Sequence, residues 1–150
     1  MRRLPLTGDD GSAIVEFCYL ALLLMIPLTY AVLTVFRLQA ASYAVAAATR
    51  EAGRAFVLTE GTDPQAAAFA GARVAAGDHG LELTPEQLTL DCRPDPACPL
   101  TPGLQVDVRV TVQVPLPLVP AVLDGVAPAS VAVSGRHVEV VDRFRRAETR

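Results

Sequence analysis

A long apolar run near the N-terminus dominates the hydrophobic pattern of this chain. Residues Phe17 to Phe36 carry no charge. A helix of about 20 such residues is roughly 30 Å long, enough to cross the hydrocarbon core of a bilayer. Gly8 and Gly11 precede the run and disfavour helix at those positions. The pattern predicts a membrane-spanning helix that begins at about Ala13.

The helical periodicity continues beyond this run. Apolar residues recur at spacings of three and four, which is typical of one face of a helix: Leu38, Ala41, Val45, Ala48, Ala52 and Phe56. We therefore predict one helix that extends to about Val57, with its second half outside the lipid. The small residues Ala40, Ala44 and Ala47 would let another helix approach closely.

The rest of the chain predicts a small domain with one more helix and an antiparallel sheet. Asp63 and Pro64 form a helix start, and this helix runs to about Ala76, where glycines end it. Strict alternation over Leu104 to Val114 predicts a strand with one buried face. Two further strands are expected: Leu88 to Cys92 and Val131 to Val141. The fold class is α+β.

Composition and charge exclude some functions. The chain has 150 residues and a net charge of -3, which argues against a nucleic-acid surface because such a surface needs clustered positive charge. No phosphate-binding loop, metal cluster or carboxylate pair stands out. His137 has Ser134 and Asp142 nearby in sequence, but sequence proximity does not make a triad. We expect no enzymatic activity, no cofactor and no metal.

Two cysteines bracket a proline-rich loop. Cys92 and Cys98 are separated by Arg-Pro-Asp-Pro-Ala, and outside the cytoplasm such a pair most simply forms a disulfide. Free thiols and a metal site are the alternatives. A metal site would need further ligands, for which the chain offers only His79 and His137 as histidines.

The segment from Gly11 to Glu16 has the pattern of a processing signal. A Gly, four residues and then a Glu, directly before a membrane-length apolar run, is the recognition pattern of prepilin peptidases. Glycine offers an unhindered backbone that a protease can draw into extended form. Cleavage between Gly11 and Ser12 would place Glu16 fifth in the mature chain.

Glu16 and Phe17 are candidate assembly residues. A carboxylate inside a membrane helix costs about 2.5 to 3.5 kcal/mol on insertion scales. Cleavage would create a positive amine at Ser12, one helical turn from Glu16 and on the same face. Glu16 would pair with its own amine or with that of a neighbouring subunit. An interfacial Glu16 beside an ordinary signal anchor is the alternative.

These residues carry a resemblance to a known family. Gly-Ser-Ala-Ile-Val-Glu-Phe at 11–17, the following Leu-rich helix and Ala-Thr-Arg-Glu-Ala-Gly-Arg-Ala at 48–55 resemble the TadE-like pseudopilins of tight-adherence (Tad, Flp-type) pilus systems. The family often has Tyr after the Glu, where this chain has Phe17. The resemblance covers roughly the first 57 residues. It implies a pilin-like fold, cleavage after Gly11, and a role as a minor pilin or pilus assembly protein.

The expected organisation follows from these segments. Residues 1–11 form a prepilin-type leader, 12–36 a transmembrane helix, 37–57 its continuation outside the membrane, and 58–150 an extracytoplasmic α+β domain. The chain would lie in the cytoplasmic membrane or in the pilus, with the domain outside the cytoplasm. Its expected partners are a prepilin peptidase, other pilins or pseudopilins, the pilus assembly platform and the lipid bilayer. The basic residues do not decide orientation, because Arg occurs on both sides of the run.

Two alternative interpretations also explain the apolar run. In one, the chain is secreted and a signal peptide is cut near Ala46–Ala48, a small-residue site. In the other, the run is an uncleaved signal anchor that holds a binding domain unrelated to pili. The N-terminus of the mature protein distinguishes all three.

Overall fold

The first helix is longer than the sequence predicted. A computed structural model describes residues 10–60, 63–117 and 130–144. In it, α1 (Asp10–Leu58) is one helix of 49 residues that includes Pro27. It begins before the predicted start at Ala13 and takes Gly11 into its first turn. A single glycine costs a helix only about 1 kcal/mol, and an acidic residue is favourable at this end.

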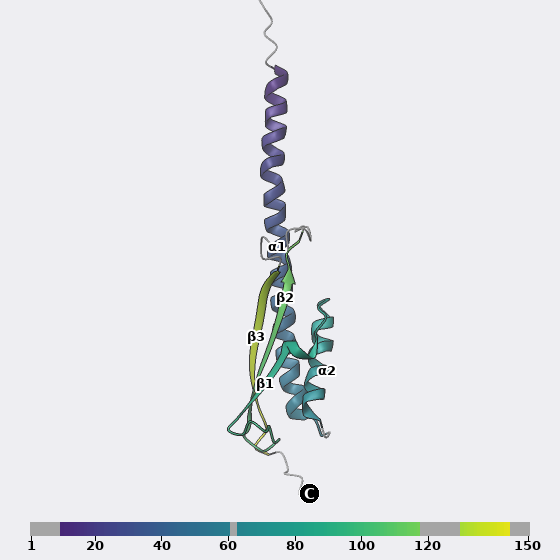
Figure 1. Cartoon of the computed structure of the whole chain (residues 1–150), viewed down its shortest axis with the longest axis vertical. Helices are drawn as coiled ribbons and strands as arrows, with labels where there is room; N and C mark the ends of the chain where they lie inside the picture. Colours follow the sequence, from purple (N-terminus) through teal and green to yellow (C-terminus); the bar gives the residue numbers. More distant parts are fainter. Residues whose placement is uncertain (1–9, 61–62, 118–129, 145–150) are drawn as a thin grey trace, which may run out of the picture.

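The two halves of α1 have different surroundings (Figure 1). Most of the helix from Ala13 to Arg37 stands alone, and its side chains are exposed apart from a few that are half-buried. From Ala41 to Phe56 one face is buried beneath the sheet and the second helix. Five of the six apolar positions predicted to form a helix face are buried here, Ala41, Val45, Ala48, Ala52 and Phe56, and Leu38 is partly buried. The second half of α1 therefore belongs to the core of the domain.

The sheet has three antiparallel strands in the order β1-β2-β3. They are β1 (Leu88–Arg93), β2 (Gln105–Pro115) and β3 (Ser130–Val140), close to the predicted ranges. Alternate valines of β2 point to α1 and are buried: Val106, Val108, Val110, Val112 and Val114. The opposite face of β2 is polar. The structure confirms the α+β class, with a long apolar helix followed by a small antiparallel sheet.

The second helix, α2 (Pro64–Gly77), packs beside α1 through small residues. The Asp63 side chain accepts a hydrogen bond from the Ala66 amide at 2.9 Å and caps the helix start. Ala68, Ala72 and Ala76 are fully buried. A short 3-10 helix, η1 (Pro85–Gln87), then leads into β1.

Two glycines allow close contact between α1 and β3. A Cβ at Gly135 would lie 2.7 Å from Cγ1 of Val45 and 3.2 Å from the Val45 carbonyl oxygen. A Cβ at Gly53 would lie 3.1 Å from Cβ of Glu139. Backbone therefore meets backbone at Gly135, and β3 lies directly on the helix.

Candidate functional site

The predicted processing residues lie at the free end of α1. The backbones of Gly11 and Ser12 are in its first turn. Glu16 and Phe17 are exposed, and the Phe17 side chain has an exposed fraction of 72%. Because residues 12 and 16 are one turn apart in a continuous helix, a new amine at Ser12 would lie on the same face as the Glu16 carboxylate.

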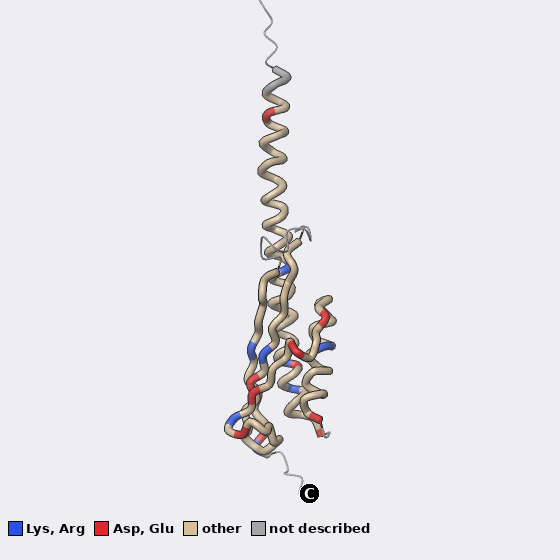
Figure 2. Tube along the Cα trace, viewed as in Figure 1, with Lys and Arg blue, Asp and Glu red and all other residues tan. Residues whose placement is uncertain are grey.

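Glu16 lies in an otherwise uncharged stretch of α1. It is the sole acidic or basic residue from Ala13 to Phe36, and Figure 2 shows this half of α1 as almost free of charged positions. Of the helices in the described part of the chain, α1 alone is long and apolar enough to cross a membrane, and none of its most apolar stretch is buried. No other part of the described chain covers this apolar surface, so its exposure to water would be unfavourable.

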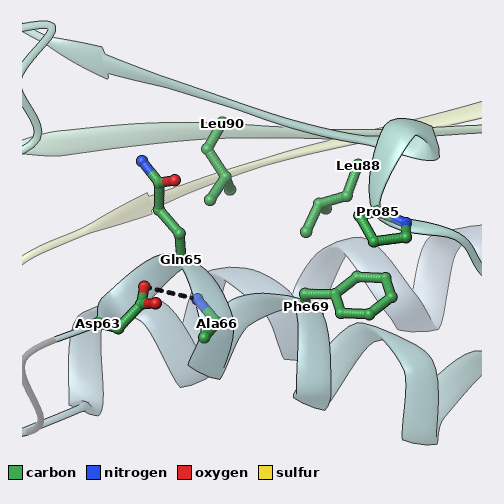
Figure 3. A pocket seen from close by; sticks show the side chains of 7 residues that line it. All are labelled: Asp63, Gln65, Ala66, Phe69, Pro85, Leu88 and Leu90. Carbon is green, nitrogen blue, oxygen red and sulfur yellow. Dashed lines mark hydrogen bonds between the residues drawn. The ribbon is translucent and has the colours of Figure 1, made fainter.

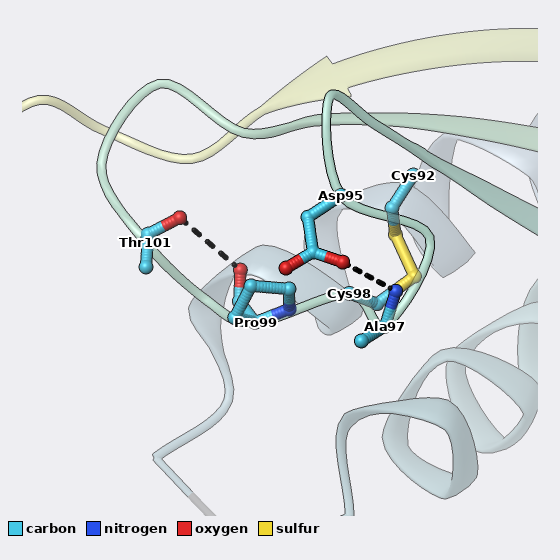
Figure 4. The surroundings of a disulfide bond; sticks show 6 residues. All are labelled: Cys92, Asp95, Ala97, Cys98, Pro99 and Thr101. Carbon is cyan, nitrogen blue, oxygen red and sulfur yellow. Dashed lines mark hydrogen bonds between the residues drawn. A yellow bond between two sulfur atoms is a disulfide. The ribbon is translucent and has the colours of Figure 1, made fainter.

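The cysteine loop lies at the opposite end of the molecule. Cys92 and Cys98 form a disulfide with a Cα–Cα distance of 5.2 Å (Figure 4). Within the loop, Oδ1 of Asp95 accepts a hydrogen bond from the Ala97 amide at 2.9 Å. Cys92 pairs with Val106 of β2, so the loop is fixed to the sheet. More than about 50 Å of helix separates it from Glu16, and the two predicted sites do not meet.

Opening this disulfide is expected to destabilise the domain. For a closed loop this short, the chain-entropy relation gives about 2 to 2.5 kcal/mol. Cys92→Ser with Cys98→Ser should lower the free energy of unfolding in detergent by that amount, measured by urea titration. Cys18→Ser is the matched control, because Cys18 is free and exposed, and it should leave stability unchanged. Equal stability of the double variant and the control would contradict the assigned role.

The outer face of the sheet carries an ion pair that was not predicted from the sequence. Nε of Arg136 donates to both carboxylate oxygens of Asp107, at 2.8 and 2.9 Å, and Nη2 donates to Oδ2. Nη2 of Arg93 lies 4.0 Å from Oδ2. Asp107 is only 9% exposed, unlike its neighbours on the polar face. The Arg136 hydrogen bonds hold the pKa of Asp107 below its ordinary value.

This pair predicts a pH-dependent contribution to stability. A carboxyl group whose pKa falls on folding stabilises the protein above its ordinary pKa, and that contribution is lost as the pH drops through the lowered value. Asp107→Asn should therefore lower the thermal midpoint at neutral pH, and the difference from wild type should shrink at about pH 3 and below. Circular dichroism at both pH values measures it. Glu82→Gln, at an exposed position, should show little difference at either; a constant deficit for Asp107→Asn would refute the linkage.

His137 has an acidic neighbour and no described nucleophile partner. Its Nε2 lies 3.0 Å from Oε2 of Glu139 on the same strand, and both side chains are about one-third exposed. They face α1 beside Gly53, on an edge strand of the sheet. Inward-pointing charged residues on an edge strand discourage pairing with another sheet. Within the described ranges, no cluster of three or more His, Cys, Asp and Glu is arranged to hold a metal ion.

A groove separates α2 from the free edge of β1 (Figure 3). It has a volume of about 400 Å³ and is lined by Asp63, Gln65, Ala66, Phe69, Pro85, Leu88 and Leu90. Three of these side chains are larger apolar groups that belong to the margin of the core: Phe69, Leu88 and Leu90. Asp63 is already engaged as the cap of α2. The lining holds no pair of catalytic groups.

The described side chains thus present one chemically unusual position, Glu16 on an uncovered apolar helix. Comparisons of the chain with protein-family models, with curated proteins and with solved structures give no match. The family resemblance therefore rests on the residues of the N-terminal segment.

Proposed function

We propose that this chain is a TadE-like minor pseudopilin of a Tad (Flp-type) pilus system. A prepilin peptidase cleaves it after Gly11, residues 12–36 hold it in the cytoplasmic membrane, and its α+β domain lies outside the cytoplasm. There it contacts other pilins or pseudopilins and the assembly platform, either in the membrane or in the pilus. The observation that carries this proposal is the uncovered half of α1 with Glu16 one turn from Ser12.

The exposed apolar surface supports a membrane position. Ile14, Phe17, Leu24 and Ile26 are each at least two-thirds exposed, on a segment with no other structural cover. Burial in lipid removes this surface from water at about 25 cal/mol per Å². The helix backbone is hydrogen-bonded internally, as a membrane segment requires.

Glu16 supports an assembly role in addition to anchoring. A lone carboxylate opposes insertion by about 2.5 to 3.5 kcal/mol, and nothing described in the chain offsets that cost. A Ser12 amine created by cleavage would do so, from the same chain or from a neighbour. An intermolecular pair would make the charge a selective contact between subunits.

The disulfide supports an external domain. Disulfides persist in oxidising compartments and are rare in the cytoplasm, and the Cys92–Cys98 bond lies in the domain. With the domain outside, Gly11 lies at the cytoplasmic end of the span, where a prepilin peptidase acts in this family.

The core argues against the signal-peptide alternative. A cut near Ala46–Ala48 would remove Ala41, Ala44 and Val45, which are buried in the folded chain. It would also break the helix that supplies the carbonyl acceptors of the buried Thr49 hydroxyl, at Val45 and Ala46. The domain would lose part of its core, whereas removal of a signal peptide leaves the core of a secreted protein intact.

Glu16→Ala tests the assembly role. Without the carboxylate the helix inserts more readily, so the variant should reach the membrane and be processed as wild type. Its incorporation into pilus complexes should fall several-fold, because the Ser12 amine loses its partner. Co-purification with the assembly platform and the count of pili measure this. Thr29→Ala, also on the exposed half of α1, is the control; normal piliation with Glu16→Ala would exclude the assembly role.

A further inference from the structure

We propose that the end of the β2–β3 pair nearest the apolar half of α1 rests on the phospholipid headgroups. We call this surface the proximal end and define it as Val114–Pro117 with Ser130 and Val131. The proposal rests on the membrane anchoring proposed above and adds a second contact between domain and bilayer. It follows from the height of the strands along α1 and from their lack of charge.

The contacts of two glycines fix how β3 runs along the helix. Gly135 packs on Val45, and Gly53 packs on Glu139 and His137. Eight residues of helix from Val45 to Gly53 rise about 12 Å. Four residues of strand from Gly135 to Glu139 rise about 13 Å. Strand and helix therefore advance together in the same direction, at about two helix residues for each strand residue.

This ratio places the proximal end beside the apolar run. Ser130 lies five residues before Gly135 in β3, which corresponds to about ten or eleven residues before Val45. That is the level of Thr34 or Val35, still within the uncharged stretch. Pro115 pairs with Ser130 and has the same height. Figure 1 shows the pair of strands extending along α1 to the start of its lone half.

The proximal end has the composition that such a position requires. From Val110 to Pro117 and from Ser130 to Gly135 the described residues carry no ionisable side chain. The charges of the sheet gather toward the other end (Figure 2). Pro115 and Pro117 lack backbone donors, so β2 ends with fewer groups that need water. Val131 is 38% exposed.

The position of Arg37 determines how deeply the chain lies in the bilayer. It is the first charged residue after the apolar run and is exposed, so its guanidinium would reach the lipid phosphates while its stem lies in the apolar layer. The proximal end, about one turn nearer the lipid, then lies at or just below the phosphates. Contact at two points limits the tilt of the domain, which a single helix would leave free.

Depth-dependent fluorescence quenching tests this contact in the full-length chain. A fluorophore is attached at Ser130→Cys, or at Pro115→Cys as a second position, in a Cys18→Ser background. The chain is placed in nanodiscs of phosphatidylethanolamine and phosphatidylglycerol that contain lipid nitroxides at the headgroup and along the acyl chains. Labels at Leu24→Cys in the span and at Thr101→Cys in the disulfide region serve as references.

The labels at 130 and 115 should lose most of their emission to the lipid nitroxides, and the label at 101 should not. Suppose that the label at position 24 is quenched while the labels at 130 and 115 stay as bright as the label at 101. The membrane anchoring is then supported and the proposed contact of the proximal end with lipid is wrong. Iodide then identifies the real environment: quenching means water, and protection means cover by protein. If the label at 24 also escapes the nitroxides, the membrane anchoring fails and this inference fails with it.

Discussion

Gly11→Val is expected to leave the chain at full length in the membrane, while wild type loses residues 1–11. The peptidase must draw the bond after residue 11 into extended form, and the structure has this residue in the first turn of α1. Glycine weakens helix at this point and brings no side chain into the protease. Valine adds branched bulk beside the bond to be cut. Intact mass of the membrane fraction, after co-production with a prepilin peptidase, measures the outcome.

Gly8→Val is the matched control for this variant. It makes the same change three residues away, outside the proposed cleavage bond, and should be processed normally. Both variants should insert into the membrane, because the apolar run is untouched. If Gly11→Val were trimmed to the same product as wild type, the assignment of Gly11 as the cleavage residue would be wrong.

Gly135→Ala should cause the largest loss of stability among single substitutions at described glycines. The new methyl group would lie 2.7 Å from Cγ1 of Val45 and 3.2 Å from its carbonyl oxygen. The side chain has some freedom to move, but the helix backbone has little. Overpacking of this kind costs about 1 to 3 kcal/mol. Urea unfolding of the full chain in detergent measures the change.

Gly77→Ala is the control, because a Cβ there meets nothing within 4 Å, and it should not destabilise the domain. Val45→Ala provides a second test, since it removes the methyl group that the new Cβ strikes. The two substitutions should then be less harmful together than the sum of their separate effects. Strict additivity would show that Val45 and Gly135 are not in contact.

Local patterns were enough to predict most of the elements. The three- and four-residue spacing from Leu38 to Phe56 identified the buried face of α1. Asp63 and Pro64 marked the start of α2, where the carboxylate is the cap. The alternation along β2 separated its buried valines from its polar face. Each of these signals involves residues that are close together in the sequence, so one sequence is enough to detect it.

Pairings between distant residues were not predictable in this way. The alternation along β2 assigns Asp107 to the polar, exposed face. Its partner Arg136 lies 29 positions later in the sequence, on another strand. Only the register of β2 against β3 brings them together. The contact of Gly135 with Val45 likewise depends on how the sheet is seated on α1. The sequence shows a glycine in the middle of β3, but it does not show why a glycine is needed there.

The boundary between stalk and domain also needed the structure. The sequence separated a helical continuation at 37–57 from a domain at 58–150. Packing joins them, because Val45, Ala48, Ala52 and Phe56 are fully buried by the domain. A helix that serves as both anchor and core ties the position of the domain to that of the span. The candidate site at Glu16 was predictable because it depends on one carboxylate and its spacing from Gly11.

The most direct test of the proposed function is the N-terminus of the mature protein. Wild-type chain is produced with a prepilin peptidase, isolated from the membrane and analysed by intact mass and N-terminal sequencing. We predict a start at Ser12, with Glu16 fifth in the mature chain. A start near residue 49, or a chain that retains Met1, would contradict the assignment as a processed pseudopilin.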